Sequence, residues 1–209
     1  MRGLRCTLLG DGPSDRVLLP IIRWTLHRLG THIEQEAWAD LSFLKTKPPK
    51  LRERVSAALR YYPCDVLFVH RDAERDDPII RLEEIRVAAD GQAARHVPVV
   101  PVRMTEAWFL HDERAIRSAS GNPRGTVALA LPRPRDVESV ADPKQVLLES
   151  LLAATELAGR RRERKKRDLQ AMRTRVAELI VDFAPLEMLP AFRQFVEAAR
   201  VAVKAVGSG

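Results

Sequence analysis

The alternation of short apolar runs with amphipathic stretches most constrains how this chain can fold. Strong apolar runs lie at residues 4–9 and 65–70, a weaker one lies at 33–41, and another at 97–102 contains Pro98 and Pro101. Runs of this length suit strands that are buried in a sheet, and the prolines favour an edge position or an irregular hydrogen-bond ladder for the last one. The pattern predicts an α/β fold with a mostly parallel central sheet flanked by helices.

Helical spacing separates and follows these runs. We expect helices over residues 17–29, 51–61, 78–89, 105–112, 143–158, 171–182 and 190–206. Thr105 is available to cap the fourth of these helices. After about residue 118 the pattern changes to Gly, Pro and Ser without clear periodicity. The chain is therefore expected to have an α/β core over residues 1–117. Residues 118–209 would form an irregular connection and a mainly helical C-terminal region packed on that core.

Composition limits the class of protein. The chain has 209 residues, of which 45% are hydrophobic, which is enough for a folded core. No apolar run approaches the roughly 20 residues that a membrane span needs. Asp11 and Asp15 interrupt the one apolar stretch near the start, so no signal-peptide pattern is expected. Cys6 and Cys64 lack metal-type spacing and are expected to be reduced core residues, which favours the cytoplasm.

A net charge of +7 favours anionic partners, with nucleic acid first among them. An arginine-rich composition is the alternative explanation. The densest positive run consists of Arg160, Arg161, Arg162, Arg164, Lys165, Lys166 and Arg167. As a helix, this run would contact the phosphate backbone of nucleic acid without recognising its sequence. The alternative is a helix or loop whose charges are simply solvated. Arg173 and Arg175 extend this charge, and Lys45, Lys47 and Lys50 form a second possible basic patch.

Carboxylates follow the ends of three predicted strands. Asp11 and Asp15 come directly after the first run, and Asp72 and Glu74 come directly after the run at 65–70. Because the carboxyl ends of parallel strands meet at one edge of a sheet, these side chains are expected to gather there. Close carboxylates repel each other unless a cation lies between them, and Mg2+ prefers oxygen ligands of this kind.

Glu106 is the third contribution, at the start of the helix expected after residues 97–102. Each segment has an ordinary alternative: a solvated acidic loop for Asp72 and Glu74, and a favourable helix-dipole interaction for Glu106. Three coincident cases favour a shared metal site. His70, at the end of the run 65–70, has two interpretations: a group near that site, or a packed or surface group, of which the second is more common for a histidine at a strand end.

The three acidic segments resemble motifs of the Toprim (topoisomerase-primase) fold. Asp11-Gly12-Pro13-Ser14-Asp15 is similar to its acidic-glycine motif, and Asp72-Ala73-Glu74 lies where the fold has its Asp-x-Asp motif. The segment from Thr105 to Asp112 is similar to one in an uncharacterised bacterial family of stand-alone Toprim-like proteins. Those proteins resemble the nuclease domains of the OLD (overcoming lysogenization defect) family. The resemblance covers most of the chain, but only the three acidic segments are specific.

The resemblance implies a metal-dependent nuclease that hydrolyses DNA or RNA. Its ligands for Mg2+ or Mn2+ would be Asp11, Asp15, Asp72, Glu74 and Glu106. Asp11 and Asp72 would be catalytic, and Lys144 is the candidate for a lysine near the scissile phosphate, although an ordinary exposed lysine is the alternative. A role in anti-phage defence is also implied. An ATPase would be a separate partner, because this sequence lacks a Gly-x-x-x-x-Gly-Lys loop.

Two departures from the Toprim pattern leave an alternative open. Asp11 stands where Glu is usual, and Glu74 stands where Asp is usual. Because Mg2+ demands strict geometry, these changes also fit a catalytically inactive subunit that binds nucleic acid or a protein partner. A Toprim-type primase or RNA-maturation enzyme shares the acidic motifs, but no zinc-binding cysteine set accompanies them here.

Overall fold

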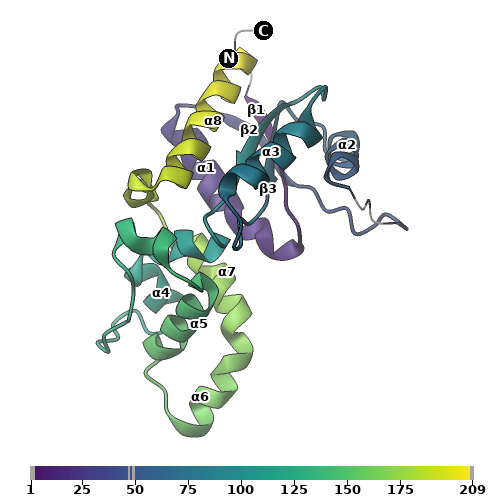
Figure 1. The fold of residues 1–209 in the computed structure, drawn as a ribbon. Coiled ribbons are helices and arrows are strands. Elements are labelled where there is room, and N and C mark those ends of the chain that lie inside the picture. Colours follow the sequence, from purple (N-terminus) through teal and green to yellow (C-terminus); the bar gives the residue numbers. More distant parts are fainter. Residues whose placement is uncertain (1–2, 47, 49, 208–209) are drawn as a thin grey trace.

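Four parallel strands form the central sheet of the protein. The computed structural model describes residues 3–46, 48 and 50–207, so Lys47 lies outside the described residues. The strands are β1 (Leu4–Leu9), β2 (Ile33–Trp38), β3 (Val66–His70) and β4 (Arg95–Val99), in the order β2-β1-β3-β4 (Figure 1). This confirms the predicted α/β class and parallel sheet. Of the two alternatives for the strand that contains Pro98, the structure has the edge position, because β4 is an outer strand.

Helices cover both faces of this sheet. Along β1, Leu8 faces one apolar cluster and Leu9 faces another, as expected from the two-residue repeat of a strand. The helices α1 (Leu19–Arg28) and α8 (Pro190–Gly207) contribute to the first cluster. The helices α2 (Leu51–Tyr61) and α3 (Pro78–Ala89) contribute to the second. The two central strands, β1 and β3, are therefore buried on both faces, which explains their nearly continuous hydrophobic runs.

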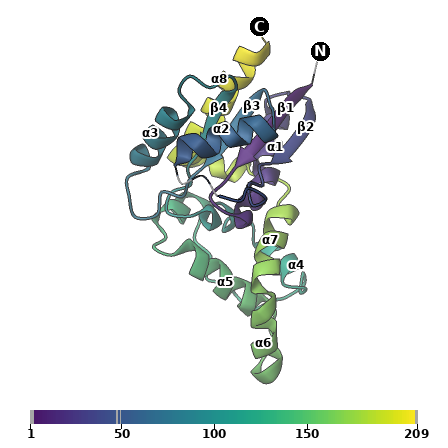
Figure 2. The same ribbon diagram turned by 90° about the vertical axis from the view of Figure 1, so that its right-hand side faces the viewer.

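A group of helices extends beyond one end of the sheet (Figures 1 and 2). It contains α4 (Glu113–Ala119), α5 (Pro143–Ala154), α6 (Gly159–Lys165) and α7 (Leu169–Leu179). The 3-10 segments are η1 (Pro13–Leu18), η2 (Thr105–Phe109), η3 (Pro134–Ser139), η4 (Lys166–Asp168) and η5 (Ala184–Met188). Because α7 packs on η1 and α5 packs on η2, this group lies against the carboxyl edge of the sheet. Figure 2 shows α6 at its far tip.

The segment after β4 differs from its prediction. Instead of one helix over 105–112, η2 ends at Phe109 and a separate helix, α4, begins at Glu113. The reason is local: the Asp112 carboxylate accepts a hydrogen bond from Ala115 N at 2.9 Å and so starts a new helix. Thr105 does not cap η2, because its side chain is directed to the carboxylate of Asp72.

Among the helices that the structure describes, none combines the length and the apolar character that crossing a bilayer requires.

Candidate active site

The candidate site lies where the strand order changes direction. β2 lies on one side of β1, while β3 and β4 lie on the other. In open parallel sheets the connections diverge at such a point, and ligands bind beyond the carboxyl ends of the two central strands. Asp11 and Asp15 follow β1, and Asp72 follows β3. The fold thus brings segments about 60 residues apart in the sequence to one edge.

Asp15 is buried in the turn after β1. Its Oδ2 accepts hydrogen bonds from the backbone N of Asp11 at 2.8 Å and of Gly12 at 3.0 Å, which closes the turn. Gly10 makes this approach possible. A Cβ at Gly10 would lie 2.8 Å from Asp15 Oδ2 and 2.7 Å from the Trp38 ring. A side chain at this position would therefore displace the carboxylate.

His70 lies at the centre of the site, with only 1% of its surface exposed. Its Nδ1 is 2.9 Å from the carbonyl oxygen of Val99, so Nδ1 carries the proton and donates it. The other nitrogen, Nε2, is 3.5 Å from Asp72 Oδ1 and 3.9 Å from Asp15 Oδ2. The Thr105 hydroxyl is 3.3 Å from the same nitrogen. His70 therefore joins the carboxylates of the two strand ends, which the sequence analysis did not expect.

The surroundings of Asp72 oppose the ionisation of its carboxyl group. Burial raises the pKa of Asp72, and the negative charges of Glu106 and Asp15 act in the same direction. His70 opposes the shift, as do the hydrogen bonds that Asp72 Oδ1 accepts from Thr105 N at 2.9 Å and Oγ1 at 3.1 Å. The structure thus places the carboxylates of Asp15 and Glu106 close enough to that of Asp72 to oppose its ionisation.

Glu106 has a cation of its own. Arg173 Nε donates to Glu106 Oε1 at 2.7 Å, and both side chains are buried. Arg173 Nη1 also donates to the backbone oxygen of Ser14 at 3.3 Å, so α7 is tied to the turn that holds Asp15. The expectation that Arg173 extends the exposed basic surface is wrong. The helical period directs Arg173 inward, while Arg175 remains exposed.

Asp11 points away from this cluster and is exposed. Its carboxylate pairs with Arg54 Nη1 at 2.8 Å and Arg71 Nε at 3.0 Å. Arg54 also donates to the carbonyl oxygen of Gly10. The two arginines come from α2 and from the segment after β3, and they neutralise Asp11 in this conformation.

Two further predicted site residues make no contact with the cluster. Glu74 has a left-handed backbone conformation, with φ 55°, and its side chain is exposed. Lys144 is exposed in the first turn of α5. Within the described chain, neither side chain forms a hydrogen bond or an ion pair. Their predicted roles stay predictions.

The predicted basic run is helical and exposed. It forms α6 and η4, and α6 buries no side chain. Lys165 pairs with Asp168 at 3.0 Å, and Lys166 pairs with Glu163 at 2.9 Å. The five arginines of the run have no carboxylate partner in the part of the chain that the structure describes: Arg160, Arg161, Arg162, Arg164 and Arg167. This surface is available for an anionic ligand.

Sequence reasoning missed the groups that balance the carboxylates. His70 had a usable signal, since it ends a buried strand two residues before Asp72. Arg54 and Arg71 had none, because exposed arginines are common in this chain. The partner of Glu106 is 67 residues away in the sequence, and no local pattern identifies it.

Comparison of the chain with protein-family models, with curated proteins and with solved structures found no match. The likeness to the Toprim fold therefore rests on the motif residues alone.

Proposed function

We propose that this protein is a divalent-metal-dependent nuclease with a Toprim-like fold. The observation that carries the proposal is the convergence of Asp15, Asp72 and Glu106 at the carboxyl edge of β1 and β3. Burial raises the pKa of Asp72 there, and the negative charges of Glu106 and Asp15 raise it further. A site that accumulates negative charge is stabilised by a cation, and its oxygen donors suit Mg2+ or Mn2+.

The carboxylate oxygens of the site are ligands that suit such an ion, but the described side chains are not arranged as a coordination shell. Among the residues described, no three His, Cys, Asp or Glu side chains are placed to hold a metal. Asp15 and Asp72 would hold the ion, and the charge of Glu106 would add to their attraction. A bound ion would lower the pKa of a water molecule and supply a nucleophile for phosphodiester hydrolysis.

The protein's own groups would prepare the site. Thr105 fixes one oxygen of Asp72, and the backbone of Asp11 and Gly12 fixes one oxygen of Asp15. Nucleic acid would be held by backbone contacts with the exposed arginines of α6. Lys144, a separate ATPase and anti-phage defence are parts of the proposal that rest on the Toprim resemblance.

The experiment is cleavage of plasmid and single-stranded DNA, and of RNA, in Mn2+ or Mg2+. Wild-type protein should cut at least one of these substrates. Asp72→Asn should lose more than about 100-fold in rate, because changes that only reorient a metal ligand already cost about 10- to 100-fold. Asp136→Asn removes an exposed carboxylate that pairs with Arg133, and it should cleave like wild type. Metal binding without cleavage of any substrate would contradict the nuclease.

A second function is a non-catalytic subunit that binds nucleic acid or a protein partner. The specific observation in its favour is that arginines already balance two carboxylates, with Arg54 and Arg71 on Asp11 and Arg173 on Glu106. This function predicts nucleic-acid binding without measurable Mn2+ binding. Cleavage that is lost in Asp72→Asn would exclude it.

A further inference from the structure

An exposed aromatic pair lies at the C-terminal end of α2. Phe43, in the loop between β2 and α2, is 57% exposed, and Tyr61, at the end of α2, is 44% exposed. Their ring centroids are 5.1 Å apart at an interplanar angle of 89°, so the edge of one ring meets the face of the other. The guanidinium of Arg60 lies 5.5 Å from the Tyr61 ring centroid. Two large rings held in place yet open to solvent form a surface on which a planar group can stack.

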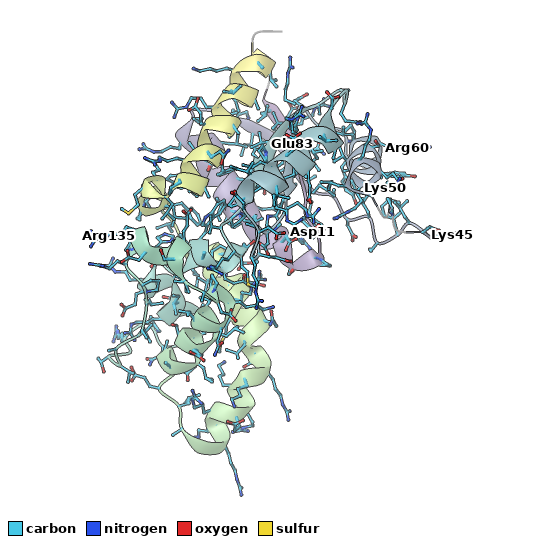
Figure 3. All side chains as sticks on the ribbon, viewed as in Figure 1. Asp11, Lys45, Lys50, Arg60, Glu83 and Arg135 are labelled. Atoms are coloured by element: carbon cyan, nitrogen blue, oxygen red, sulfur yellow. The ribbon has the colours of Figure 1, made fainter. Side chains whose placement is uncertain are left out.

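The chain segment that follows Phe43 is rich in cations, and Asp40 and Glu53 are the acids that flank it. Between residues 41 and 52 the sequence contains Lys45, Lys47, Lys50 and Arg52 and no acid. Figure 3 shows Lys45, Lys50 and Arg60 on the same flank of the molecule, to one side of Asp11. In the described residues, none of these three cations pairs with a carboxylate. The charge is therefore free to meet an anion.

We infer that Phe43 and Tyr61, with Lys45, Lys50 and Arg60, bind single-stranded nucleic acid. Aromatic rings beside unpaired cations match the two parts of an unpaired nucleotide, a base with a flat face and a phosphate. A duplex does not expose its base faces, so it would meet only the cations. This surface differs from α6, which has cations without aromatic residues and suits backbone contacts alone. The inference does not depend on catalysis or on metal.

The direct test is binding of a fluorescein-labelled oligothymidylate of about 20 nucleotides, followed by anisotropy in EDTA. Phe43→Ala should weaken binding about tenfold, because loss of one stacked base has an effect of this order. Phe43→Trp should keep wild-type affinity, since it keeps a flat ring. A duplex of the same length should bind Phe43→Ala and wild type equally. Val181→Ala, which shortens another highly exposed apolar side chain, is the matched control.

A second experiment changes the lysines and leaves the aromatic pair intact. Lys45→Gln with Lys50→Gln should reduce the slope of log affinity against log salt by about 0.7 for each lysine on a single strand. Circular dichroism checks that each variant is folded.

Three results would overturn the inference. Phe43→Ala could bind the oligothymidylate as tightly as wild type, or it could lose duplex and single-strand affinity equally. Alternatively, sedimentation could show that Phe43→Ala changes the oligomeric state while nucleic-acid binding is intact, which would assign the surface to a second copy of the chain. Because EDTA prevents cleavage, none of these results reports on the proposed nuclease.

Discussion

At the carboxyl edge of the sheet, buried carboxylates lie beside a histidine and an arginine that compensate their negative charge. Sequence alone identified Asp15, Asp72 and Glu106 as candidates, because each follows a strand. It did not identify His70 as the neighbour of Asp15 and Asp72, or Arg173 as the partner of Glu106, since those contacts depend on tertiary packing. The position of these three carboxylates at one sheet edge could therefore be predicted, whereas the outward direction of Asp11, the isolation of Glu74 and the partner of Glu106 could not.

The buried ion pair between Arg173 and Glu106 gives the first prediction. Arg173→Met should lower the free energy of unfolding by about 3–5 kcal/mol, because it leaves Glu106 buried without a partner. Arg173→Met combined with Glu106→Leu should recover much of this loss. Urea unfolding measures both. The control is Arg175→Met, an exposed position on the same helix. If the double variant lost as much free energy of unfolding as Arg173→Met alone, the unpaired Glu106 would not be the cause of the destabilisation.

Cys6 gives a prediction about pH. Burial raises the pKa of Cys6 from 9.0 to about 12. The folded protein then holds the thiol proton more tightly than the unfolded chain does. The contribution of Cys6 to stability is therefore complete below pH 9 and is lost as pH rises from 9 towards 12.

Unfolding measured between pH 8 and 10.5 should accordingly show a smaller decline in stability for Cys6→Ala than for wild type. In native protein, iodoacetamide should label Cys64 before Cys6, because Cys6 is buried and Cys64 is partly exposed. Rapid labelling of Cys6 without unfolding would contradict this environment.

Among helices and strands, periodicity predicted the buried elements best. The strands at 4–9 and 66–70 and the helices at 51–61 and 78–89 lie where the apolar pattern placed them. The pattern failed at 105–112, where a polar side chain starts a new helix. It also did not distinguish a 3-10 turn from an α-helix after β1, because both begin with a proline and an acid. The helix that carries the basic run was left open, since its charge fits a loop equally well.

For the exposed helix α6, we predict that substitutions change DNA binding and leave the free energy of unfolding unchanged. Arg161→Gln with Arg164→Gln should leave urea unfolding unchanged, because α6 buries no side chain. The same variant should weaken duplex DNA binding and reduce its salt slope by about 0.9 for each arginine. Arg200→Gln, on the exposed face of α8, should change neither measurement. An unchanged salt slope in the α6 variant would remove this helix from the nucleic-acid surface.

For the molecule as a whole, the sheet and the C-terminal helices share one core. A single apolar cluster joins Leu8 and Phe68 of the sheet to Leu151 of α5, Val176 of α7 and Phe195 of α8. The division at residue 117 remains a prediction, and it falls inside α4. The sequence showed the change of pattern near this point. It did not show that α8 returns to cover the sheet, because the face that a helix covers depends on the path of the chain.

The shared core predicts how the protein unfolds. Residues 1–117 expressed alone should lack a cooperative thermal transition, because α8 no longer covers one face of the sheet. The full chain should show a single transition in calorimetry. A cooperative transition in the shortened chain would instead show that the α/β part folds independently.

Calorimetric titration of the full chain with Mn2+ tests the proposed metal site most directly. The convergence of carboxylates predicts binding by wild type and its loss in Asp72→Asn. Gly10→Ala should also lose affinity, since its methyl group meets the carboxylate of Asp15. Asp136→Asn should bind like wild type. Wild-type protein that binds no Mn2+, or binding that survives in Asp72→Asn, would contradict a metal site at the carboxyl edge of β1 and β3.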